Sequence, residues 1–142
     1  MNTSPTTHRF VAILNKKVEQ GRVMNALGHM AVGFSQLVDN KESLRFDNYT
    51  DGDNNLHKSI SDNPFIVLAA DNSNQIRTLR NKLVELEIPF NDFLSTMVEG
   101  TFEDQHKRTE MTPEAELDYW GICFFAENEI SKELTKKFSL WK

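Results

Sequence analysis

The chain has 142 residues, the size of a single domain, and its 39% of hydrophobic residues suffices for one core. The longest apolar run near the start, residues 10–14, is too short for a signal peptide or a membrane-spanning helix. The single cysteine, Cys123, excludes an internal disulfide. Four scattered histidines provide no zinc-ligand spacing. We expect a cytoplasmic protein that needs no metal or cofactor and has no membrane partner.

Charge is distributed unevenly along the chain. The net charge is −5, which argues against non-specific nucleic-acid binding, since that binding depends on neutralising phosphates. Residues 1–38 carry four cations and one acid, whereas residues 92–118 carry eight acids and two cations. We therefore expect a basic end and an acidic segment, or else an ordinary solvated surface.

The first half of the chain predicts a strand and a helix after a frayed terminus at residues 1–7. Residues 9–14 are rich in Phe, Val and Ile, which is typical of a buried strand. From residue 21 to 38 the apolar residues recur at spacings of three and four, which predicts a helix. This stripe consists of Val23, Leu27, Met30, Phe34 and Leu37.

The middle of the chain predicts a loop followed by a second strand and helix. Residues 39–63 are polar and broken, and their Asp-Gly-Asp stretch lacks the ligand spacing and closing glutamate of a calcium loop. Residues 65–70 are uniformly apolar, which favours a strand covered on both faces. Residues 74–87 repeat leucine and isoleucine at helical spacing and end before Pro89.

The last third predicts two more strands and a closing helix. Residues 89–98 can form a strand, the acidic residues 99–116 are expected to be loop, and residues 117–126 are a strong strand candidate. Apolar residues at spacing four from Ile130 predict a final helix that ends near Trp141. Strands that alternate with helices predict one α/β domain over residues 8–142, a three-layer α/β/α sandwich around a mixed sheet of about four strands.

An anion site is predicted where the first helix begins. Lys16 and Lys17 precede it, and Gly21 and Arg22 open it. The first amides of a helix lack internal partners and carry partial positive charge. Three cations beside them make a site for a small anionic ligand, a phosphate or carboxylate, although no glycine-rich phosphate loop is present.

A second stripe of this helix carries a candidate catalytic histidine. At 100° per residue, Arg22, Asn25 and His29 share one face beside small residues. His29 can there act as a general base or proton carrier near neutral pH. The alternative is a half-buried histidine bonded to a backbone carbonyl.

Residues 21–33, Gly-Arg-Val-Met-Asn-Ala-Leu-Gly-His-Met-Ala-Val-Gly, resemble the first helix of type 2 peptidyl-tRNA hydrolases. Gly21, His29 and Gly33 coincide with that motif, and Arg22 replaces a lysine. The chain is more similar still to the domain of unknown function 2000 family. The resemblance implies a peptidyl-tRNA hydrolase type 2-like fold, with His29 in the site.

Two positions depart from that motif. Ala26 stands where the hydrolases have glutamine, and a register counted from Pro89 places Ser95 at their aspartate. Ser95 can hydrogen-bond but cannot act as a carboxylate. Asp92 is nearby, although three residues along a strand place it on the opposite face.

Two functions are therefore expected from different classes. As a hydrolase, the protein would bind a small anionic or ester-like substrate with Lys16, Lys17 and Arg22, while His29 acts with Ser95 or Asp92. As a binding module, the same surface would hold a ligand or a protein without chemistry. The small residues Gly28, Val32 and Ser35 on another side of the helix would then suit a homodimer. Binding of tRNA ranks third, because the acidic segment suits no tRNA backbone.

Overall fold

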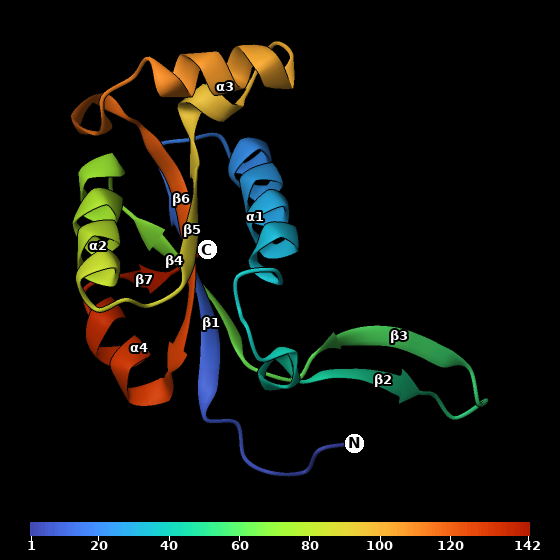
Figure 1. Ribbon diagram of the computed structural model, residues 1–142. Coiled ribbons are helices and arrows are strands. Elements are labelled where there is room, and N and C mark those ends of the chain that lie inside the picture. Colours follow the sequence, from blue (N-terminus) through green and yellow to red (C-terminus); the bar gives the residue numbers. More distant parts are fainter.

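The protein, described here by a computed structural model of residues 1–142, has a five-stranded mixed sheet in the order β5–β6–β1–β4–β7 (Figure 1). Strands β1 and β4 are parallel, and each other pair of neighbours is antiparallel. The sheet is mixed, as predicted, but has five strands rather than four. Its strands are β1 (His8–Asn15), β4 (Phe65–Ala70), β5 (Phe90–Leu94), β6 (Tyr119–Glu127) and β7 (Ser139–Leu140).

Helices cover both faces of this sheet (Figure 1). Helix α1 (Gln20–Phe34) lies on one face, and α2 (Ser73–Glu85) and α4 (Asn128–Thr135) lie on the other. Helix α3 (Phe102–Glu110) lies across the end of the sheet, above α1 and β5. Both faces of β1 and β6 are thus buried, which explains the unbroken apolar run of β1, whereas β4, predicted to be covered on both faces, is only partly buried and exposes Phe65.

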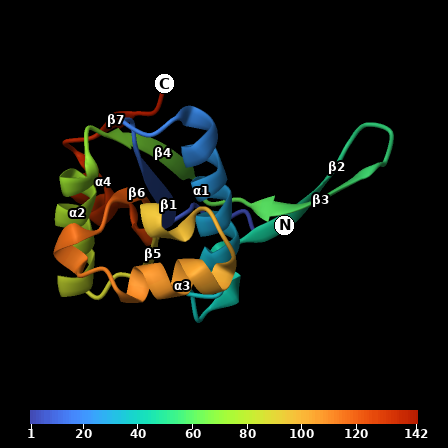
Figure 2. The same ribbon diagram turned by 90° about the horizontal axis from the view of Figure 1, so that it is seen from above.

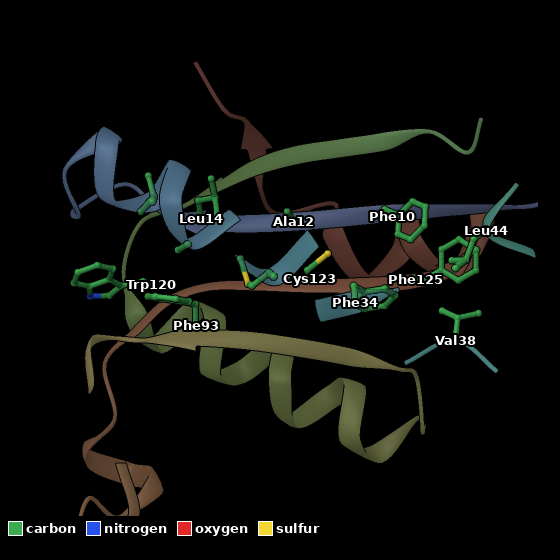
Figure 3. Close-up of a cluster of buried hydrophobic side chains, with 13 residues drawn as sticks. Phe10, Ala12, Leu14, Phe34, Val38, Leu44, Phe93, Trp120, Cys123 and Phe125 are labelled. Atoms are coloured by element: carbon green, nitrogen blue, oxygen red, sulfur yellow. The ribbon is translucent and has the colours of Figure 1, made fainter. Parts of the chain in front are cut away.

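Alternation along β1 divides the core into two clusters. Phe10, Ala12 and Leu14 face α1, and Figure 3 shows them with Cys123 of β6 in the cluster on that side. Val11 and Ile13 point the other way, toward Ile76, Leu79 and Leu83 of α2. Successive side chains of a strand point to opposite faces, so one apolar strand supplies both clusters.

Residues 39–63, predicted to be a loop, contain a β-hairpin. After a 3₁₀ turn at Lys41–Leu44, β2 (Phe46–Thr50) and β3 (Leu56–Ser61) pair as a separate antiparallel sheet. The Asp51 side chain accepts hydrogen bonds from the amides of Asp53 and Asn55 and shapes the turn between them. Figure 2 shows this hairpin projecting away from the body of the protein.

The acidic segment, also predicted to be loop, contains helix α3. Its start is fixed by a capping box, in which the Thr101 side chain accepts from the Asp104 amide and the Asp104 carboxylate accepts from the Thr101 amide. Short 3₁₀ turns, Ser95–Met97 and Glu114–Glu116, flank it.

Both end helices are shorter than predicted. Helix α1 ends at Phe34 rather than near Val38, and α4 ends at Thr135 rather than near Trp141. Ser139 instead pairs with Ala69 as the edge strand β7. Residues 1–7 form no helix or strand.

Candidate functional site

A cleft of about 590 Å³ opens between α1, β5 and α3. Its walls carry two histidines and three side-chain amides, and apolar side chains line its base. The histidines are His29 and His106, the amides are Asn25, Asn91 and Gln105, and the apolar residues include Met30 and Phe93. Convergent polar groups around a small apolar base are typical of a ligand-binding site.

Helix α1 provides one wall because its period places Asn25 and His29 one turn apart on the same side. The His29 side chain is exposed, and its ring lies beside Phe93 with 5.8 Å between the ring centroids. This placement differs from the half-buried histidine of the alternative interpretation. His29 is therefore available to a molecule in the cleft.

Strand β5 provides the base of the cleft through alternate residues. Phe93 faces α1, and so does Asn91, whose Nδ2 donates a hydrogen bond to the carbonyl of Met30 at 2.9 Å. Gly33 lies beside this amide, and a Cβ there would stand 3.4 Å from Asn91 Nδ2, an ordinary van der Waals contact. The Oδ1 atom of Asn91 is buried and has no hydrogen-bond partner in the protein. It is a buried polar atom at the edge of the cleft whose hydrogen-bonding capacity the protein leaves unused.

Helix α3 provides the opposite wall and is attached by few contacts. Arg108 donates to the carbonyls of Thr96 and Val98, at 3.1 and 2.7 Å, and the hydroxyls of Thr109 and Thr96 are hydrogen-bonded. None of the helix's own residues is buried. These contacts place His106 on the cleft.

Arg22 lies near the cleft, at the start of α1. Its guanidinium stands over the ring of Trp120, with 5.8 Å between Cζ and the ring centroid, and lies 4.0 Å from the carboxylate of Glu99. Glu99 lines the cleft. Both partners of this pair are largely exposed, so the pair constrains Arg22 weakly.

The other predicted anion-binding residues lie apart from the cleft. Lys16 pairs with Asp71 at 2.5 Å, and Lys17 lies in a shallow depression with Asn72 and Ser73 at the start of α2. Gly21 is exposed on α1. The two lysines thus gather at the ends of β1 and β4, and Arg22 alone of the three cations lies near His29.

Asp92 and Ser95, the two groups expected opposite His29, are oriented differently. Asp92 borders the cleft but pairs with Ile122, whose side chain lies in the cluster beneath α2, so its carboxyl group points to that face. Burial there raises the pKa of Asp92, with Arg80 and Glu114 as its charged neighbours. Ser95 begins a 3₁₀ turn and is absent from the cleft lining.

Four polar residues of the cleft, Asn91, Gln105, His106 and Thr109, are not among the candidates that the sequence supplies. Three of them lie on α3, in the acidic segment predicted to be loop, although Thr101 and Asp104 have the spacing of a capping box, which is typical of a helix start. Asn91 follows Pro89 in a possible strand, and no local pattern distinguishes it. Its role depends on the packing of β5 against α1.

Two further properties concern metals and membranes. No group of three or more His, Cys, Asp or Glu side chains is arranged to hold a metal ion. None of the helices has both the length and the apolar character needed to cross a bilayer.

Comparisons with known proteins place the chain in a family. Its fold is similar to the solved structure of Atu0240, a protein of unknown function from Agrobacterium tumefaciens strain C58, with a TM-score of 0.80 and 18% sequence identity. That match covers 96% of this chain and 98% of the other. No curated protein matches the chain significantly. Residues 8–142 match the family described as protein of unknown function (DUF2000), and the chain therefore belongs to that family.

Proposed function

We propose that the cleft between α1, β5 and α3 is the active site of a hydrolase for a small, anionic, ester- or acyl-containing substrate. The observation that supports this most is the exposed His29 imidazole in a cleft that it shares with the side-chain amides of Asn25, Asn91 and Gln105. A positioned histidine is the commonest general base in hydrolysis.

Four groups in or beside the cleft have a role in this proposal. His29 takes a proton from a water molecule that attacks the substrate carbonyl carbon, and it returns this proton to the alcohol or amine that leaves when the acyl bond breaks. The amide groups of Asn25 and Gln105, which line the cleft, donate to the oxyanion that forms on the carbonyl oxygen. Arg22 binds the anionic end of the substrate, because its guanidinium keeps donors that the distant Glu99 carboxylate does not use.

The proposal extends to the fold and to a distant relationship. The helices on both faces of the mixed sheet support a three-layer arrangement like that of type 2 peptidyl-tRNA hydrolases. In the α1 motif, His29 and Gly33 coincide with positions of those enzymes.

The second candidate is a non-catalytic module that binds a small anion in the same cleft. It is favoured by the orientation of Asp92, whose carboxyl group points toward α2 and leaves His29 without an acidic partner from β5. In this case Arg22 and the amides hold the ligand and no bond is broken.

The experiment is hydrolysis of a panel of carboxylate-bearing aryl esters and of peptidyl-tRNA by the purified protein, His29→Ala and His57→Ala. His57 is an exposed histidine of the hairpin and serves as the matched control. We expect kcat/KM to fall by about 100-fold or more in His29→Ala and to be unchanged in His57→Ala.

Equal turnover by the wild type and His29→Ala would contradict the proposed role of His29. If no substrate is hydrolysed, calorimetric binding of the same carboxylates, lost in Arg22→Ala, would establish the binding module instead. If peptidyl-tRNA is bound, its affinity should fall steeply with salt.

A further inference from the structure

Two side chains that the proposed function uses, His29 and Arg22, stand well apart along α1. They are seven residues apart on one face of the helix, which corresponds to about 10 Å at the usual helical rise. The His29 ring lies beside Phe93, whereas the Arg22 guanidinium lies near the carboxylate of Glu99. The two side chains therefore contact groups of one molecule that are separated by a similar distance.

One stretch of the chain, residues 93–99, connects the position of the histidine with that of the arginine. It runs from Phe93 through Met97 and Val98 to Glu99, and these four residues all line the cleft. Met97 and Val98 are half-buried and pack against the hydrophobic cluster shown in Figure 3. The wall of the cleft that leads from His29 toward Arg22 is therefore mainly apolar.

The two arginines near the cleft both lie at its Glu99 end. No lysine or arginine is among the residues that line the cleft, and the polar groups that share it with His29 are mostly uncharged amides and a hydroxyl. Arg108 donates to three main-chain carbonyls of residues 96–99, so its donors are occupied. Arg22 has only the long contact with Glu99, at 4.0 Å, and its guanidinium is therefore the group that binds an anion here.

We propose that the substrate is an ester in which an extended apolar chain separates the carbonyl under attack from a carboxylate by about 10 Å. This inference rests on the proposed function and adds the length and the character of the substrate. The carbonyl lies beside His29, the chain lies along the apolar wall, and the carboxylate takes the place of Glu99 beside Arg22. An extended chain advances roughly 3.3–3.6 Å over three bonds, so the separation corresponds to about eight or nine bonds.

The arrangement selects for length because both ends of the substrate have to be bound at once. A shorter chain cannot reach Arg22 while its carbonyl lies beside His29, and a longer chain has to bend. The pair of Arg22 and Glu99 is long and largely exposed, so a substrate carboxylate replaces Glu99 at little cost. The two oxygens of that carboxylate can accept a pair of hydrogen bonds from the guanidinium, which Glu99 at its distance does not.

The test is hydrolysis of aryl monoesters of straight-chain dicarboxylic acids, from chains much shorter than the expected separation to chains much longer. Esters of the same lengths that end in a methyl group serve for comparison. We expect kcat/KM of the carboxylate series to peak at about eight or nine bonds, at least about tenfold above its shortest and longest members, and the methyl series to show no such peak.

Variants identify the residues that read the length. Arg22→Ala should remove the peak, and Arg22→Lys should retain it at reduced height, because an ammonium group keeps the charge without the planar set of donors. Glu99→Gln removes the competing carboxylate and should raise kcat/KM of the carboxylate series by about two- to fivefold. Lys132→Ala, at an exposed cation of α4 on the other face of the sheet, is the matched control and should leave the profile unchanged. Circular dichroism confirms that each variant is folded.

The outcomes separate this inference from the proposed function. Hydrolysis that depends on His29 but not on chain length, or a peak that persists in Arg22→Ala, would overturn the inference and leave the proposed function intact. If no ester is hydrolysed, the proposed function fails, and calorimetric binding of the same monoesters decides the inference by itself. An affinity that peaks at the same length and is lost in Arg22→Ala supports it, whereas an affinity independent of length, or no binding, overturns it.

Discussion

The side-chain amide of Asn91 donates to the main-chain carbonyl of Met30 at 2.9 Å and so ties the edge strand β5 to helix α1. This contact fixes the distance between the two walls that meet at the base of the cleft. It also turns the second amide atom, Oδ1, into a buried acceptor without a partner. Asn91 thus joins two elements and lines the cleft, and its hydrogen bond to Met30 contributes to stability.

Removal of this hydrogen bond should lower the stability of the protein. Asn91→Ala should lower the free energy of unfolding by about 1 kcal/mol, the usual contribution of one hydrogen bond, and Asn91→Asp by more, because its carboxylate would face the Met30 carbonyl. Urea denaturation measures the change. Asn81→Ala, at an exposed position of α2, is the control and should shift stability by less than about 0.5 kcal/mol. An Asn91→Ala variant as stable as the wild type would show that the contact is not maintained in solution.

Some residues of the cleft can be predicted from the helical period of α1, whereas others depend on how separate elements pack together. Asn25 and His29 can be placed on one face because the helical period alone decides it. Asn91 and His106 belong to other elements, and their approach to His29 depends on the position of β5 at the sheet edge and on α3 above it. Lys16 is close to Arg22 along the sequence, but it lies past the end of β1 beside Asp71 and does not line the cleft.

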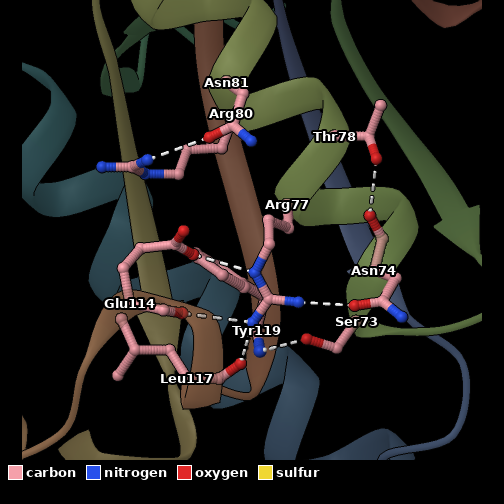
Figure 4. A network of polar contacts seen from close by, with 9 residues as sticks. All are labelled: Ser73, Asn74, Arg77, Thr78, Arg80, Asn81, Glu114, Leu117 and Tyr119. Carbon is pink, nitrogen blue, oxygen red and sulfur yellow. Dashed lines mark hydrogen bonds and ion pairs between the residues drawn. The ribbon is translucent and has the colours of Figure 1, made fainter.

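A polar network joins α2 to the start of β6, with Arg77 at its centre (Figure 4). Its Nε donates to the Glu114 carboxylate at 2.8 Å, a second nitrogen donates to the Leu117 carbonyl, and its guanidinium lies over the Tyr119 ring. The Tyr119 hydroxyl donates to the same carboxylate at 2.9 Å. The pKa of Tyr119 is raised to about 12, mainly by burial and to a smaller extent by this hydrogen bond.

Arg77→Ala should leave the Leu117 carbonyl without its donor and lower the free energy of unfolding by about 1–3 kcal/mol. Arg77→Lys should not restore it, because one ammonium group cannot reproduce the planar set of donors. Thermal denaturation measures both, with Lys82→Ala on the exposed side of α2 as control. Full rescue by lysine would mean that charge alone matters at this position.

The elements that could be predicted from the sequence are those that bury a stripe of apolar side chains. Strands β1 and β4 and helices α1 and α2 show runs or periods because their apolar residues enter the core. The β2–β3 hairpin and α3 contribute no residue to either cluster, so no hydrophobic period marks them. Only local hydrogen bonding indicates these elements, namely the turn at Asp51 in the hairpin and the capping box of α3.

The Cys123 thiol should be inert in the folded protein. It lies in the cluster shown in Figure 3, and burial raises its pKa to about 12, so neither access nor the reactive thiolate is available. Labelling with a chromogenic disulfide reagent should therefore proceed at the rate of unfolding and accelerate with urea. Met24→Cys, which adds an exposed thiol, provides the reference for prompt labelling. Prompt labelling of the wild type would contradict the burial of this residue.

The Asp92 carboxyl group should make stability depend on pH in a direction opposite to most acids. Burial raises its pKa in the folded state, so folding favours the protonated form. Its contribution to stability is therefore greatest below the ordinary pKa of aspartate and is lost as the pH rises through the raised value.

Asp92→Asn keeps the shape and removes the charge, so it should raise the free energy of unfolding at about pH 7 and leave it nearly unchanged at about pH 3. Urea midpoints at the two pH values, with Asp39→Asn as the control for removal of an exposed charge, test this. A loss of stability in Asp92→Asn at neutral pH would mean that the carboxylate has a favourable partner, such as Arg80, that outweighs its burial.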